Sequence, residues 1–169
     1  MRKRRGLVYL VGNLPYLAML LLGSAVLAAV LRWSAWAWVA AGAYLVCGVL
    51  GAFWIMVFLC PHCALWGSPA CPSGYGLLAS RIRARQSGRQ FAEKFKRHIP
   101  VIVPLWIVPP LAGGWGVAYR FSWYLVGLVA VFVLSAFVIL PLASVAHGCA
   151  ECPNRNQCPW RRRKRHTAH

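Results

Sequence analysis

The chain has 169 residues, 60% of them hydrophobic, and it carries 19 Lys and Arg against only two acidic residues. This balance excludes an ordinary soluble globular domain, in which about 25% of residues are charged and both signs are mixed. The net charge of +17 on so apolar a chain indicates a membrane protein with basic segments outside the bilayer.

The apolar residues fall into four blocks without a charged side chain, at residues 7–31, 33–59, 99–119 and 121–145. Each block is close to the ~20 residues that a helix needs to cross a hydrocarbon core of about 30 Å. The first block is too long for the apolar core of a signal peptide, and one short turn leads from it into the second. We therefore predict an all-α membrane protein with four transmembrane helices, arranged as two tandem hairpins.

The positive charges are distributed unevenly between the two ends of these predicted helices. Four lie in residues 2–5, seven in residues 81–97 and six in residues 155–165, whereas the two short turns hold one each, Arg32 and Arg120. The positive-inside rule then places both termini and the central loop in the cytoplasm, with the protein in the inner (cytoplasmic) membrane. Trp and Tyr side chains flank both short turns, as expected at the opposite membrane surface.

Six of the seven cysteines follow the inner ends of the second and fourth predicted helices. They form a first triad, Cys60-x2-Cys63-x7-Cys71, and a second triad, Cys149-x2-Cys152-x5-Cys158, while Cys47 lies inside a span. In a reducing cytosol such clusters are metal ligands rather than disulfides. An inverted topology would instead favour three disulfides. The charge distribution favours the metal interpretation, with all six cysteines as ligands.

The two halves of the chain follow the same plan, in which a basic stretch precedes two spans and a cysteine triad ends the half. This repeat predicts a duplication about an axis along the membrane normal. The resulting units are a first hairpin with its triad (1–71), a basic amphipathic cytoplasmic loop (72–98), a second hairpin with its triad (99–158) and a basic tail (159–169).

The central loop and the third span carry further signals. Ser87-Gly88 divides the loop into two expected short helices that lie on the membrane, with arginines towards anionic headgroups. The third span is interrupted by prolines and glycines, so we expect it to kink or unwind, with neighbouring groups bonding the freed carbonyls. These residues are Pro100, Pro104, Pro109, Pro110, Gly113, Gly114 and Gly116.

The second triad lies in the stretch "CAECPNRNQCPW", which resembles the C-x2-C-x5-C portion of the iron–sulfur loop in endonuclease-three-type DNA glycosylases and in the auxiliary-cluster domains of radical enzymes. The resemblance implies that Cys149, Cys152 and Cys158 bind a [4Fe–4S] cluster, with a fourth ligand from elsewhere. It covers about ten residues. Four of the six cysteines precede proline, as does the last cysteine of bacterial ferredoxin runs, and this is compatible with zinc as well.

Six thiolates can bind metal in more than one way. The alternatives are one four-thiolate site with two spectator cysteines, two three-thiolate clusters with other fourth ligands, or a binuclear zinc site. His62 and His147 can each complete a coordination shell or serve as an interfacial residue. No C-x-x-C-H sequence is present, so covalent haem is excluded.

Three functions fit these residues. The first is an iron–sulfur electron-transfer protein that connects a soluble donor with a membrane quinone or a partner subunit. The second is a structural or interaction protein held by zinc, and the third is a thiolate-based metal or redox sensor. No Ser/His/Asp set or carboxylate pair supports hydrolytic catalysis. The expected partners are anionic lipid headgroups and a redox protein, and we expect no nucleic acid, because the basic tail serves as a positive-inside anchor.

Overall fold

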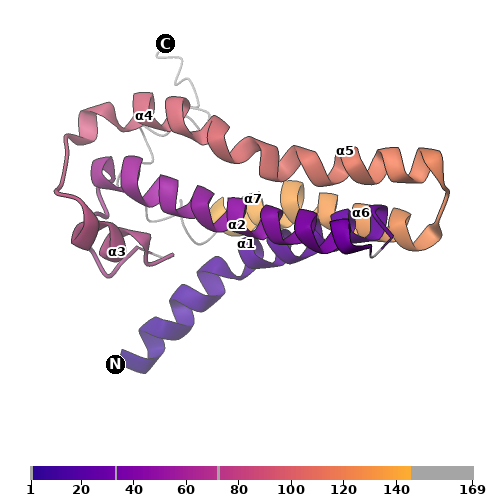
Figure 1. Cartoon of the computed structure of the whole chain (residues 1–169). Helices are drawn as coiled ribbons and strands as arrows, with labels where there is room; N and C mark the ends of the chain where they lie inside the picture. Colours follow the sequence, from indigo (N-terminus) through magenta and orange to yellow (C-terminus); the bar gives the residue numbers. More distant parts are fainter. Residues whose placement is uncertain (1, 33, 72, 146–169) are drawn as a thin grey trace, which may run out of the picture.

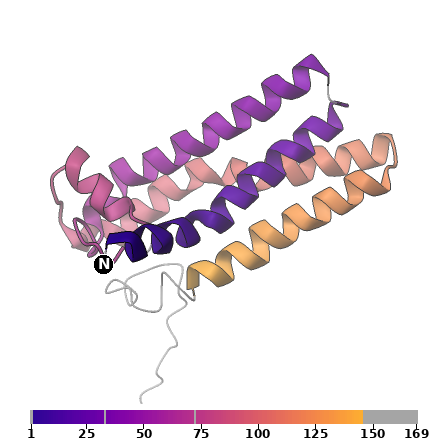
Figure 2. The same cartoon turned by 90° about the horizontal axis from the view of Figure 1, so that it is seen from below.

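The computed structural model describes residues 2–32, 34–71 and 73–145, and this part of the chain is helical, without strands (Figure 1). It contains four helices that are long and apolar enough to cross a membrane, at Val8–Val30, Ala35–His62, Gly88–Tyr119 and Trp123–Ala143. The predicted all-α fold with four such helices is therefore confirmed. The four helices lie side by side in an elongated bundle (Figure 2).

Two pairs of helices make up the bundle. A turn that begins at residues 31–32 leads from α1 (Arg2–Val30) to α2 (Ala35–Phe58), and a turn at residues 120–122 joins α5 (Val103–Tyr119) to α6 (Trp123–Leu134). Helix α1 packs against α2, α5 and α6 and so connects the two pairs. Both turns lie at one end of the bundle, called the turn end below (Figures 1 and 2).

The opposite end holds the first cysteine triad and is called the cysteine end. Helix α2 leads there into a 3₁₀ turn at Cys60–His62, and α3 (Tyr75–Ile82) packs against both elements. Helix α4 (Phe91–His98) follows after a short 3₁₀ turn at Gly88–Gln90. The expected division of the central loop near Ser87 is present. However, α4 continues through a 3₁₀ turn at Ile99–Ile102 into α5, so it extends the third span (Figure 1).

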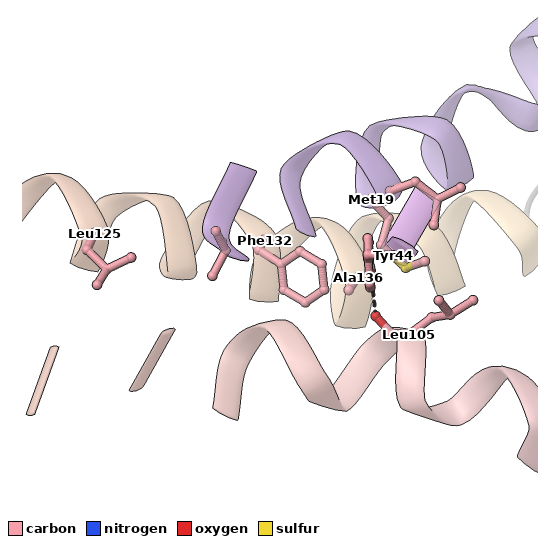
Figure 3. Close-up of a cluster of buried hydrophobic side chains, with 8 residues drawn as sticks. Met19, Tyr44, Leu105, Leu125, Phe132 and Ala136 are labelled. Carbon is pink, nitrogen blue, oxygen red and sulfur yellow. Dashed lines mark hydrogen bonds between the residues drawn. The ribbon is translucent and has the colours of Figure 1, made fainter. Parts of the chain in front are cut away.

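The core lies where α1 meets the other three spans. Met19, Tyr44, Leu105 and Phe132 are buried together there, one from each span (Figure 3). Large apolar side chains on the outer faces of the same helices are exposed in great number. Apolar surface of this extent is unfavourable in water and matches a hydrocarbon environment.

Helix α5 stays helical through its two internal prolines, Pro109 and Pro110. The expected unwinding does not occur within Val103–Tyr119, whereas Pro100 lies in the 3₁₀ turn Ile99–Ile102 that precedes this helix. Pro109 has no N–H, so the Leu105 carbonyl, four residues earlier, loses its helical donor. The Tyr44 hydroxyl of α2 donates a hydrogen bond to this carbonyl at 2.7 Å, in the buried core (Figure 3). A neighbouring helix thus satisfies the freed group, as the sequence predicted.

The fourth span adapts to its proline in a different way. Pro141 cannot donate to the Phe137 carbonyl, and the segment Ser135–Ile139 just before it is a π-helix. The Leu140 N–H donates to the Ser135 carbonyl, five residues earlier. Helix α7 (Leu140–Ala143) completes the span, so this wider turn carries the helix past the proline.

Candidate functional site

The first triad begins where α2 stops. Pro61 has no N–H to continue the α-helix, and the chain tightens into the 3₁₀ turn of Cys60–His62. The Cys63 N–H closes this turn by donating to the Cys60 carbonyl at 3.0 Å. Pro61 is fully buried, so the end of the helix is fixed by packing as well as by the turn. Cys60 and Cys63 are both half-buried at this point.

The segment from Cys63 to Tyr75 folds back on itself through tight turns. Gly67 and Gly74 have φ angles of +70° and +74°, which side chains other than glycine rarely adopt. The Gly67 N–H donates to the Gly76 carbonyl of α3 at 3.0 Å, and the Gly74 N–H donates to the Cys71 carbonyl at 3.0 Å. These bonds bring Cys71 back towards the end of α2.

The three thiols of the first triad gather at the cysteine end. The thiols of Cys63 and Cys71 both lie within electrostatic reach of Cys60. The Cys71 Sγ accepts a hydrogen bond from the Gly76 N–H at 3.4 Å and lies 3.6 Å from the Ser73 Oγ. No disulfide joins the cysteines of the described part of the chain. By contrast, Cys47 lies exposed inside α2, well before the triad.

Tyr75, the first residue of α3, belongs to the same group of side chains. Burial raises the pKa of its phenol, and the neighbouring Cys60 and Cys71 raise that pKa further. A phenol that keeps its proton is a hydrogen-bond donor beside thiolates. Tyr75 was not predicted as a site residue, because no spacing in the sequence connects this tyrosine with the cysteines.

Helix α1 holds the loop that carries Cys71. The Tyr9 hydroxyl donates to the Pro69 carbonyl at 3.0 Å, and the Asn13 Nδ2 donates to the Ser73 carbonyl at 3.0 Å. The same Asn13 Nδ2 lies 2.7 Å from the Tyr9 carbonyl within α1. Both loop contacts join residues 60 positions apart in the sequence. The position of the first triad therefore depends on α1 as well as on α2 and α3.

His62 is buried between the two triad cysteines that flank it, with 3% of its surface exposed. Its Nδ1 lies 3.0 Å from the Ser87 carbonyl, an arrangement in which Nδ1 carries the proton and donates it. The Nε2 atom then keeps its lone pair. Metal-binding histidines commonly have this second hydrogen bond, which fixes the tautomer and the ring.

A small polar pocket of about 190 Å³ adjoins His62 and Cys63, and Arg85 and Arg89 also line it. The segment that carries these arginines is fixed by the Gln86 N–H, which donates to the Pro61 carbonyl at 2.9 Å. The pocket is thus lined by two cationic side chains together with a thiol and an imidazole. It joins segments more than 20 residues apart, and no local pattern in the sequence predicts it.

Helix α4 also contacts α2 at the cysteine end. The Trp54 Nε1 donates to the His98 Nδ1 at 3.2 Å, and the His98 ring stacks on Phe58 with ring centroids 5.0 Å apart. Arg83 lies over the same Phe58 ring at 5.7 Å. These contacts connect the last turns of α2 to the end of α4.

The structure describes the first of the two predicted cysteine triads. The second triad, Cys149, Cys152 and Cys158, lies outside the described residues, as does His147. Within residues 2–32, 34–71 and 73–145, no three His, Cys, Asp or Glu side chains are arranged to hold a metal ion. The first triad is therefore gathered without forming a ligand set of its own in this structure.

The chain matches no protein-family model, no curated protein and no solved structure.

Proposed function

We propose that this is an integral membrane iron–sulfur protein that transfers electrons at the cytoplasmic membrane surface, as a subunit of a redox complex or as its partner. The observation that carries the proposal is the gathering of Cys60, Cys63 and Cys71 at one end of the bundle, brought about by Pro61 and by the tight turns of the following loop. Thiolates are soft ligands, which suit iron–sulfur clusters, zinc and Cu(I). One-electron transfer is the chemistry that such a cluster supplies.

The end of the fourth span supports a site shared by both triads. Helix α7 ends at Ala143, at the same end of the bundle as α3, and Cys149 follows six residues later. Six residues reach at most about 20 Å in an extended chain. Cys149 can therefore lie no more than about 20 Å from Ala143, and we propose that the second triad supplies the ligands that the first triad lacks.

The charges of the described residues support a cytoplasmic location for this end. The seven basic residues of 81–97 lie in α3, α4 and the segment between them, at the cysteine end. Of the basic residues that the structure describes, only Arg32 and Arg120 lie at the turn end. Under the positive-inside rule this bias favours a cytoplasmic location of the cysteine end, and we propose the inner membrane as the membrane that holds the bundle. A reducing compartment keeps the thiols available for metal.

The experiment is anaerobic purification of the full chain in detergent, followed by iron, acid-labile sulfide and zinc analysis with visible spectra before and after dithionite. We expect a brown protein with matched iron and sulfide that bleaches on reduction. Cys60→Ala, Cys63→Ala, Cys149→Ala and Cys152→Ala should each abolish metal retention. Cys47→Ala is the matched control, because this exposed thiol lies inside α2, and it should retain the metal. Normal iron content in Cys63→Ala and Cys149→Ala would refute the shared site.

His62 favours a second candidate, a zinc site that joins the inner ends of α2 and the fourth span and serves a structural or interaction role. A buried imidazole with its Nδ1 directed at a backbone carbonyl suits a mixed Cys/His zinc site. A colourless protein that contains zinc, and that loses it in His62→Ala but not in His98→Ala, would establish this candidate and remove the electron-transfer proposal.

A further inference from the structure

The turn end of the bundle contains a pocket that the cysteine chemistry does not use. It has a volume of about 680 Å³ and lies between the turn from α1 to α2 and the turn from α5 to α6. Its lining includes two arginines and four aromatic side chains: Arg32, Arg120, Trp115, Tyr119, Phe121 and Tyr124. The pocket thus combines the two arginines of this end with four aromatic rings, three of which also carry a polar N–H or O–H group.

The two arginines have no counterion in the described part of the chain. The whole sequence has only two acidic residues, Glu93 and Glu151. Glu93 lies in α4, towards the cysteine end, and Glu151 is outside the described residues. Two guanidinium groups that line one pocket have like charges, and an anion between them would offset their repulsion. Guanidinium groups bind phosphate with paired hydrogen bonds, so phosphate is the anion that this pair suits.

The backbone fixes both arginines at helix ends. The Arg32 N–H donates to the Ala29 carbonyl at 3.1 Å, and the Arg120 N–H donates to the Gly116 carbonyl at 2.9 Å. Arg32 is also the one non-glycine residue of the described chain with a positive φ, at 56°. Glycine adopts this backbone conformation without the steric cost that other residues bear. A side chain kept against that cost points to a role for the side chain itself.

The aromatic residues place the pocket at the depth of lipid headgroups. Trp115 and Tyr119 are 70% and 76% exposed, and their rings stack with centroids 6.0 Å apart. Phe121, Trp123 and Tyr124 are exposed as well. Such rings are unfavourable in bulk water and favourable at the interface between headgroups and hydrocarbon. The pocket lies at the ends of three apolar helices, α1, α5 and α6, where that interface is expected.

We propose that Arg32 and Arg120 bind the headgroup phosphate of an anionic membrane lipid in this pocket. The lipid's phosphate lies between the two guanidinium groups, and the aromatic rings contact its glycerol and the first part of its acyl chains. The net negative charge of the lipid neutralises one of the two cations, which a zwitterionic lipid does not do. This site is independent of the metal proposed at the cysteine end.

The test uses the full chain in phosphatidylcholine nanodiscs that contain a small fraction of phosphatidylglycerol with a photoactivatable diazirine beside its headgroup. Crosslinked residues are mapped by tandem mass spectrometry. The basic segment 81–97 also attracts anionic lipid, so its crosslinks provide an internal reference in each sample. We expect crosslinks at residues 115–125 to fall about tenfold in the Arg32→Gln/Arg120→Gln double variant, with those at 81–97 unchanged. Unchanged crosslinks at 115–125 would overturn the proposal.

Competition in the wild-type protein provides a second measurement that does not depend on the folding of a variant. Unlabelled phosphatidylglycerol should remove the crosslinks at 115–125, whereas additional phosphatidylcholine should not. Soluble glycerophosphoglycerol presents the same phosphodiester without acyl chains. If it competes as well as the lipid does, the ligand is a small phosphate compound and the lipid assignment is wrong. If phosphatidylcholine competes equally, the arginines do not select an anionic lipid, and the proposal is wrong.

Discussion

Replacing Tyr44 with Phe removes the one hydroxyl that bonds the Leu105 carbonyl from outside its helix. That hydrogen bond is 2.7 Å long, and the Tyr44 side chain is only 6% exposed. The carbonyl has no helical donor because Pro109 lacks an N–H. A buried acceptor left without a partner costs about 1–3 kcal/mol in proteins generally, and hydrogen bonds measured between membrane helices reach about 1.7 kcal/mol. We expect Tyr44→Phe to lower the free energy of unfolding by about 1.5 kcal/mol.

The origin of this cost can be isolated by a second substitution, Pro109→Ala, which restores an N–H four residues after Leu105. Pro109 is fully buried, so this change has a packing effect of its own, and a double-mutant cycle removes it. In the Pro109→Ala background Tyr44→Phe should cost less than half as much. The assay is equilibrium unfolding in mixed micelles with increasing SDS, followed by circular dichroism.

Tyr16→Phe provides the control for the loss of a hydroxyl. The Tyr16 hydroxyl donates to the Gly48 carbonyl at 2.9 Å, but Ala52 supplies that carbonyl with its ordinary helical N–H. Tyr16→Phe should therefore cost less than Tyr44→Phe. An equal cost of Tyr44→Phe with and without Pro109 would refute the explanation that proline creates the need for the tyrosine.

Three further substitutions test the two ends of the bundle. Gly76→Ala should separate α3 from the cysteine loop, because the new Cβ would meet the backbone carbonyl of Leu65. We expect the free energy of unfolding to fall by about 1–3 kcal/mol and maleimide to label Cys71 faster. Gly42→Ala adds its Cβ in open space and should show neither effect. Asn13→Ala should also speed the labelling of Cys71, since it removes the bond to the Ser73 carbonyl, and an unchanged rate would show that α1 does not hold the loop. Arg32→Gly should raise the free energy of unfolding in detergent by about 1 kcal/mol, because glycine adopts the positive φ of this position without strain. A lower free energy of unfolding would show that the positive φ of Arg32 is not strained.

The four spans could be predicted because long uncharged apolar blocks have few alternatives in a folded protein. The extension of the third span could not. Arg97, His98 and Pro100 resemble the end of a loop, and the helix continues through them because His98 contacts Trp54 and Phe58 of α2. Contacts between distant residues override local preference there, and they leave no periodic signal in the sequence.

The candidate site could likewise be predicted only in part. The spacing of Cys60, Cys63 and Cys71 after an apolar block predicts that they lie together at the end of a helix, and the structure brings them together. Whether they bind metal with the second triad stays a prediction. The pocket beside His62 could not be foreseen, because it depends on the return of residues 85–89 to the end of α2. Sequence reasoning treated Arg32 and Arg120 only as exceptions to a charge bias, since their common pocket arises from the packing of α1 against α5 and α6.

The bond from Tyr44 to Leu105 also bears on the biogenesis of the protein. A helix entering the bilayer alone must satisfy its own carbonyls, and α5 cannot do so at Leu105. Its partner hydroxyl comes from α2, which is synthesised about 60 residues earlier. The third span therefore has a favourable membrane environment only after the second is in place. Synthesis from the N-terminus provides that order, and a chain rearranged to present α5 first should insert it poorly.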